Sequence, residues 1–169
     1  MAVFRNHPSE WNDLDWTILR SGSISVYRRQ EYLNSDIDWF QKEHYNVVRF
    51  QCSTWTSEDK MHQDLRDKLG FPDYYGSNYN ALNDCLEEIE MKDTGLVIVF
   101  EHFDQLQNDT RQMLLNIFDR ASRFHLLMGN RMINLLQVDD PGIEFEPIKA
   151  YHVHWNNREW NTADRHLKD

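Results

Sequence analysis

Short apolar runs alternate with helix-like segments through the middle of the chain. Residues 46–52, 96–100 and 132–138 each contain a run of strand length, and each predicts a buried strand. The run at 96–100 is entirely apolar, which indicates a central strand covered on both faces. The order strand, helices, strand, helix, strand predicts an α/β fold in which helices pack on a small three-stranded parallel sheet.

Three helices are predicted between these strands. The first begins near Ser57, a good N-cap residue, and ends at Gly70. The second covers residues 77–91. The third follows capping residues at 108–110. Its apolar stripe consists of Met113, Leu114, Ile117, Phe118 and Ala121.

The two ends of the chain are less regular. Within residues 1–45, Ser21-Gly22 separates two apolar stretches and predicts a hairpin. Within residues 139–169, positions 151–155 alternate and predict a strand with Tyr151, Val153 and Trp155 on one face. We interpret both ends as extensions that add strands to the sheet or cover one of its edges.

Charge narrows the range of partners. The 169 residues include 28 acidic and 18 basic side chains, a formal net charge of −10. Nucleic-acid binders usually present a basic face, and anionic membranes repel an acidic protein. We therefore expect neither a nucleic-acid nor a membrane partner, but a basic molecule. Simple solubility is the other interpretation of this charge.

The cysteine count and the hydrophobic runs indicate the compartment. Cys52 and Cys85 each lie in an apolar segment, which is typical of reduced core residues and not of a disulfide framework. The first residues show no apolar signal sequence, and no run reaches the length of a membrane span. We expect a cytoplasmic protein.

The helix predicted from Asn78 has two different faces. Apolar residues occupy one half of it, and polar, mostly acidic residues occupy the other. Asn80, Asp84 and Glu87 form a row at i, i+4 and i+7. From Pro72 to Asp104 there are eight acidic residues and one basic residue. The carboxylates could simply solvate the helix, but such like-charge crowding favours a surface for a basic partner.

A loop and the helix after it form a continuous motif within residues 71–86. The motif residues are Pro72, Asp73, Tyr74, Tyr75, Gly76, Ser77, Asn78, Ala81, Leu82, Asp84, Cys85 and Leu86. This motif resembles the binding loop and helix of the barstar family of ribonuclease inhibitors. The resemblance in element order covers residues 46–138, so that 1–45 and 139–169 stand outside it.

This resemblance implies an immunity protein that plugs the active site of a toxic enzyme, most naturally a basic ribonuclease. It assigns to Asp84 the role of entering the phosphate pocket of the enzyme. A carboxylate can imitate a phosphate because both pair with Arg and Lys. The remaining expected contact residues are Tyr74, Gly76 and Asn78 in the loop and Asn80, Asn83 and Glu87 beside Asp84.

The chain departs from the family pattern at four positions. Asn80 replaces an aspartate, Asn83 a tryptophan, and Glu87 a neutral polar residue. Arg120 stands where the family has an acid on the last long helix, with Asp119 beside it as a possible substitute. These departures predict a partner other than barnase.

Catalytic and metal-binding alternatives have weak support. Cys85 adjoins Asp84, but neighbouring helix residues point about 100° apart, and Cys85 falls on the apolar face. His152 and His154 could form half of a metal site, yet no HExxH spacing and no glycine-rich phosphate loop accompany them. We expect no enzyme activity, no metal and no cofactor.

Two other binding functions stay open from the sequence. The same fold could be a non-inhibitory acidic adaptor that binds some other basic protein. It could also be an immunity protein against a toxin with different chemistry, such as a deaminase or an NAD-consuming enzyme.

Overall fold

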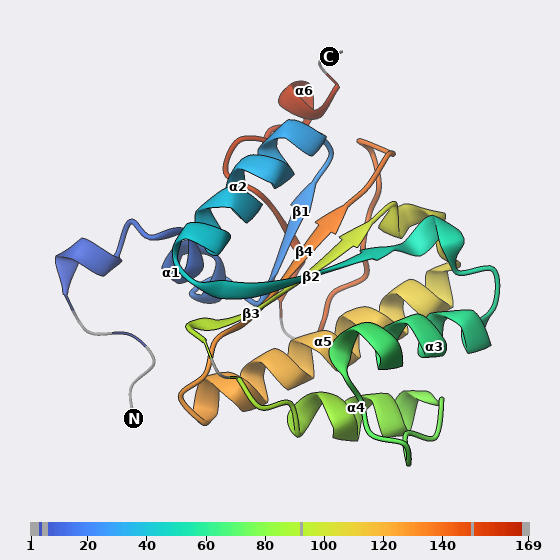
Figure 1. Cartoon of the computed structure of the whole chain (residues 1–169). Coiled ribbons are helices and arrows are strands. Elements are labelled where there is room, and N and C mark those ends of the chain that lie inside the picture. Colours follow the sequence, from blue (N-terminus) through green and yellow to red (C-terminus); the bar gives the residue numbers. More distant parts are fainter. Residues whose placement is uncertain (1–3, 5–6, 92, 150, 167–169) are drawn as a thin grey trace.

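A computed structural model describes residues 4, 7–91, 93–149 and 151–166 (Figure 1). The strands are β1 (Ile24–Tyr27), β2 (Tyr45–Gln51), β3 (Gly95–Glu101), β4 (Met132–Gln137) and β5 (His154–Trp155). The α-helices are α1 (Leu14–Leu19), α2 (Gln30–Lys42), α3 (Glu58–Leu69), α4 (Tyr79–Glu87), α5 (Asn108–Leu127) and α6 (Thr162–Arg165). Short 3-10 turns cover Pro8–Glu10, Cys52–Thr54 and Phe103–Gln105.

The sheet contains the three predicted central strands and one further strand from each end of the chain. Its five strands lie in the order β2-β3-β4-β1-β5, and every neighbouring pair is parallel. The expected three strands are β2, β3 and β4, and β1 and β5 extend this core to a five-stranded sheet. β1 pairs with β4 from Ile24 opposite Asn134 to Tyr27 opposite Gln137. A strand of four residues depends on such a partner and carries little periodic signal of its own.

The predicted hairpin around Ser21-Gly22 is wrong, although its second arm is indeed a strand, β1. The segment before Ser21-Gly22 is helix α1, and these two residues lead from that helix into β1. Leu14 and Ile18 are four residues apart and both pack toward the core, which is helical spacing. The predicted strand at 151–155 is also shorter than expected, because only His154 and Trp155 pair with β1.

Helices cover both faces of the sheet. Figure 1 shows α2 on one face and α3, α4 and α5 on the other. Alternate residues of β3 face the two layers: Val97 and Val99 belong to the core under α2, and Ile98 and Phe100 to the core under the other helices. Every residue of β3 is buried, which confirms the expectation of a central strand covered on both sides.

The predicted helix ends are partly confirmed. Ser57 caps α3 by accepting a hydrogen bond from the amide of Lys60, and Gly70 ends that helix with φ 68°. The N-cap of α5 is Gln107 and not one of residues 108–110. Met113 was expected on the apolar stripe of α5, but its side chain is exposed. The other expected stripe residues, Leu114, Ile117, Phe118 and Ala121, are buried. Within the residues that the structure describes, no helix combines the length and apolar character that a membrane crossing requires.

A buried carboxylate ties the C-terminal segment to the end of β1. Glu159 is completely buried. Its two carboxylate oxygens accept hydrogen bonds from the backbone amides of Arg28 and Arg29, both at 3.0 Å, and from the Asn156 amide nitrogen at 2.6 Å. Asn156 also donates two hydrogen bonds to the carbonyl of Val26. These contacts hold β5 against β1, although β5 is only two residues long.

Candidate functional site

The loop before α4 is anchored by one tyrosine and presents the other. Tyr75 is buried against Phe71, with ring centroids 5.0 Å apart, and its hydroxyl contacts Nδ1 of His62 on α3. Tyr74 is 74% exposed, and its hydroxyl donates a 3.0 Å hydrogen bond to Glu88. The two adjacent tyrosines therefore have different functions: Tyr75 fixes the loop, and Tyr74 offers an aromatic surface to solvent.

The N-cap residue of α4 also shapes the loop. Asn78 accepts a 2.9 Å hydrogen bond from the amide of Ala81 and donates a 3.0 Å hydrogen bond to the carbonyl of Gly76. A Cβ atom on Gly76 would lie 2.9 Å from the Asn78 side-chain nitrogen. Ser77, between them, has φ 47°. A glycine at position 76 therefore leaves the space that the Asn78 side chain occupies, and that side chain is engaged within the loop.

α4 has the two faces that its sequence predicted. Leu82, Cys85 and Leu86 are buried against the core. Asn80 and Asp84 are exposed, and Asn83 and Glu87, also on the polar side, are half-buried. Among the described residues, the side-chain carboxylate of Asp84 has no hydrogen-bond or ion-pair partner, although its backbone carbonyl accepts a hydrogen bond from the amide of Glu88. The Asp84 carboxylate is therefore available to an external cation.

Three of the eight acids in the segment 72–104 are paired with bases from other elements. Arg66 on α3 and Arg120 on α5 pair with acids of the segment 72–104, and so does Arg49 on β2. The pairs are Asp73–Arg66, Glu87–Arg120 and Glu101–Arg49, with N···O distances of 2.6, 3.0 and 2.6 Å. The sequence count of eight acids against one base therefore overestimated the field, because it counted only neighbours along the chain.

Asp119 and Arg120, the two residues considered for the family's acid position on the last long helix, lie in different environments. Asp119 is 1% exposed and accepts hydrogen bonds from Ser23, from Arg123 and from the hydroxyl of Tyr151. It faces the start of β1 and not the surface of α4, so the proposal that it substitutes for an acid on the binding face is wrong. Arg120 is exposed and pairs with Glu87.

Comparison with known families agrees with this fold and this motif. The family model described as "Barstar (barnase inhibitor)" matches residues 45–138, which is more than half of the chain. The chain belongs to the barstar family. The match begins within one residue of the resemblance found in the sequence and includes α3, α4, α5 and the three central strands. β1 and β5 of this barstar-family chain lie outside it.

A curated relative is similar over a shorter stretch. Across 44 residues the chain is 50% identical to a protein of Bacillus subtilis (strain 168) named "Putative ribonuclease inhibitor YrdF". This alignment covers 26% of the chain and 46% of the relative. The chain thus matches about half the length of that protein.

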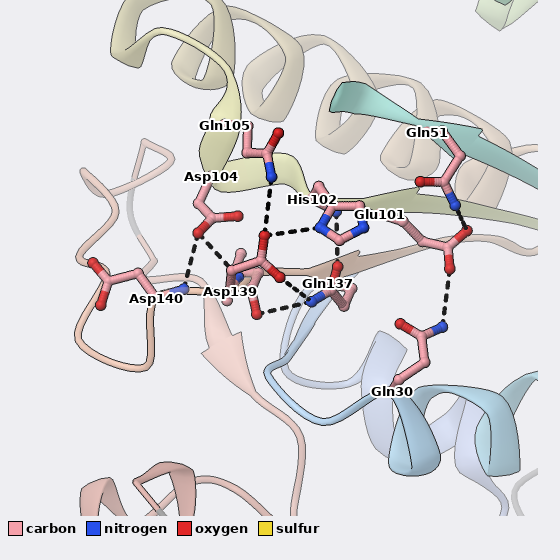
Figure 2. Close-up of polar contacts among 10 residues, drawn as sticks. Gln30, Gln51, Glu101, His102, Asp104, Gln105, Gln137, Asp139 and Asp140 are labelled. Atoms are coloured by element: carbon pink, nitrogen blue, oxygen red, sulfur yellow. Dashed lines mark hydrogen bonds and ion pairs between the residues drawn. The ribbon is translucent and has the colours of Figure 1, made fainter. Parts of the chain in front are cut away.

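A second polar cluster lies at the carboxyl ends of the central strands (Figure 2). Glu101 at the end of β3 is buried and accepts hydrogen bonds from Arg49, Gln51 and Gln30. Gln30 is the first residue of α2. The carboxylate therefore joins three elements, and its oxygens are already engaged by them. The sequence contains one signal for this cluster, because polar residues directly follow the apolar runs that form the central strands.

The loop after β4 completes this cluster. Asp139 accepts hydrogen bonds from His102 at 2.8 Å and from Gln105 at 3.1 Å. Burial favours the neutral form of Asp139, but these hydrogen bonds outweigh it and lower the pKa of the carboxyl. Asp104 accepts from the backbone amides of Asp139 and Asp140. All these contacts are internal, so we assign the cluster to loop structure.

The environments of the two cysteines in this barstar-family chain do not favour a reactive thiolate. Cys52 and Cys85 are free and buried, and burial raises the pKa of both thiols. Cys85 faces the core while Asp84 faces solvent, so the two do not form a catalytic pair. Within the described residues, no group of three or more His, Cys, Asp or Glu side chains has a metal-binding arrangement.

Proposed function

We propose that this protein is an inhibitor of a basic ribonuclease and that it occludes the active site of the enzyme with the outer face of α4. The observation that carries the proposal is the exposed, unpartnered carboxylate of Asp84 at the centre of that face, within the family's motif. As an immunity protein it would act in the cytoplasm, before the enzyme reaches cellular RNA.

The chemistry of Asp84 suits a phosphate pocket. Ribonuclease active sites bind the RNA backbone with cationic side chains, and a carboxylate pairs with Arg or Lys in a similar geometry. In the row formed by Asn80, Asp84 and Glu87, Asn80 is neutral and Glu87 is paired with Arg120. Asp84 is thus the one residue of this row with an uncompensated charge, and we infer that the enzyme's pocket accepts a single carboxylate from α4.

The neighbouring residues have supporting roles in this proposal. Tyr74 supplies an exposed aromatic ring at the edge of the contact, and Gly76 and Asn78 hold the loop in the shape that enters the cleft. Asn80 and Asn83 border Asp84 and offer amide groups for hydrogen bonds to the enzyme. Because the loop is held by internal hydrogen bonds, little conformational entropy should be lost on binding.

Capture from the native host tests this proposal. The wild-type protein, an Asp84→Arg variant and an Asp38→Arg variant serve as baits, and RNA cleavage is measured in each eluate after the inhibitor is denatured. Asp38 is an exposed acid on α2, which covers the opposite face of the sheet (Figure 1), so it controls for the change of charge. We expect ribonuclease activity with wild type and Asp38→Arg and none with Asp84→Arg.

Titration of the captured ribonuclease then tests occlusion. An active-site inhibitor should abolish RNA cleavage at one equivalent, whereas an adaptor should bind without abolishing it. Asp84→Ala should weaken binding by about 2–5 kcal/mol, or roughly 30- to 5,000-fold in Kd; complexes of barnase with barstar are among those that define this range. The proposal would be overturned if wild type and Asp84→Ala bound the ribonuclease with equal affinity, or if the saturated complex still cleaved RNA at the full rate.

A further inference from the structure

The carboxyl end of α5 exposes a compact apolar patch. Phe124, Leu127 and Met128 are 36%, 84% and 64% exposed, respectively. Four other large hydrophobic side chains are comparably exposed in the described part of the chain: Met113 lies near the other end of α5, and Trp11, Tyr74 and Trp160 lie outside that helix. Scattered apolar residues are ordinary on a protein surface, but a cluster of three within one helix end marks a contact surface. We call these three residues the α5 patch.

The α5 patch is continuous with the face that carries Asp84. Arg120 pairs with Glu87 at 3.0 Å, and Phe124 and Leu127 follow it by four and seven residues, on the same side of the helix. His125 Nε2 lies 2.8 Å from the carbonyl oxygen of Leu86, which fixes the carboxyl end of α5 beside that of α4. Figure 1 shows the two helices running side by side and ending on the same side of the molecule.

Charge changes in steps across this surface. It is anionic at Asp84 and neutral at the Glu87–Arg120 pair. It is apolar at the α5 patch, whose farthest helical residue lies about 10 Å beyond Arg120 along the helix axis. A partner that fits it must present a cationic pocket with exposed apolar side chains on one side. An apolar anchor next to an electrostatic one is a common arrangement in tight interfaces.

We propose that the enzyme which receives Asp84 also seats apolar side chains on the α5 patch, and that this second contact determines which enzyme is retained. The inference rests on the proposed function and extends it to a specificity surface. The two contacts have different kinetic signatures. Asp84 affects the association rate, its dependence on salt and the dissociation rate, whereas the α5 patch affects the dissociation rate alone.

Binding kinetics of a double variant, Leu127→Ser with Met128→Ser, test this inference. The probe is the ribonuclease purified from the wild-type bait described above. Both residues are largely exposed, so the variant should fold normally. The matched control is Trp160→Ser. Trp160 is 72% exposed and lies just before α6, away from α4. Association and dissociation rates are measured at low and high salt.

The double variant should dissociate about 10- to 100-fold faster, which is the range expected when truncation removes energetically important interface residues. Its association rate and salt dependence should stay at the wild-type values, and Trp160→Ser should change neither rate. If the double variant dissociates at the wild-type rate while Asp84→Arg no longer binds, the specificity surface is wrong and the proposed inhibitor function stands.

The oligomeric state provides the other decisive outcome. Sedimentation of the free wild-type protein should show a monomer. A dimer that becomes monomeric in the double variant would assign the α5 patch to contact with a second copy and overturn the proposal. Recovery of no ribonuclease on the wild-type bait would overturn both the inhibitor function and the specificity surface.

Discussion

The buried carboxylate of Glu159 allows a prediction of stability from its contacts. Replacing it with alanine removes the acceptor for three hydrogen bonds, from the amides of Arg28 and Arg29 and from the side chain of Asn156. Hydrogen bonds to a charged group are worth about 1.5–3 kcal/mol each. Arg28 and Arg29 are only half-buried, so water can replace part of what is lost. We therefore expect Glu159→Ala to lower the free energy of unfolding by about 3–5 kcal/mol.

Urea denaturation measures this loss directly. The midpoint should fall while the m-value stays near that of the wild type, because the buried surface of the folded state changes little. The melting temperature should drop by roughly 6–20 °C for a domain of this size. Glu146→Ala is the matched control, since Glu146 is an exposed acid in the same C-terminal part of the chain.

Hydrogen exchange locates the effect. The amides of Arg28 and Arg29 should lose protection in Glu159→Ala, while amides of β3 should change only by the loss in global stability. A loss below about 1 kcal/mol, the net value of one ordinary hydrogen bond, would refute the reasoning. It would mean that the end of β1 does not depend on this carboxylate.

Three further predictions concern the loop, the thiols and pH. Gly76→Ala should lower the free energy of unfolding by about 1 kcal/mol, because the new Cβ would displace the Asn78 cap. Gly142→Ala is the control, since a Cβ fits there, and it should leave the melting temperature unchanged. Cys85 should react with a thiol reagent at pH 8 far more slowly in the native protein than in urea, because burial raises its pKa; equal rates would contradict this. Burial lowers the pKa of His62 below its usual 6.5, so stability should be complete above pH 6.5 and should fall as the pH drops toward 5, since the unfolded state binds the proton better. In His62→Gln, the urea midpoint should depend less on pH between pH 6.5 and 5. An unchanged slope would show that another group is responsible.

Local patterns were enough to predict the centre of the fold. β2, β3 and β4 and the helices between them follow from apolar periodicity, and the N-cap of α3 and its terminal glycine follow from residue type. These features depend on contacts within a few residues, so a single sequence records them. The strand at the position of β1 was predicted, but its pairing was not, and α1 was mistaken for a strand, because segments of four to six residues have too few periods to be distinguished without their partners.

The candidate site divides in the same way. The two faces of α4 and the exposure of Asp84 are properties of one helix, and they could be inferred from the chain alone. The N-cap of α4 is Asn78 and not Ser77, the residue that the sequence suggested. The pairing of Glu87 with Arg120 could not be inferred, because the two residues are 33 positions apart and meet only when α4 packs on α5. The burial of Asp119 is likewise decided by Ser23 and Tyr151, from opposite ends of the chain.

The physical reason is the range of the interactions involved. Helical periodicity, capping and apolar runs are short-range, and they place one carboxylate on the outer face of a helix in a barstar-family motif. Charge compensation and the joining of surfaces are long-range. Packing of α4 beside α5 leaves Asp84 uncompensated and brings an apolar helix end next to it, and the extension of the sheet by β1 and β5 buries residues that the central segment alone would leave at an edge.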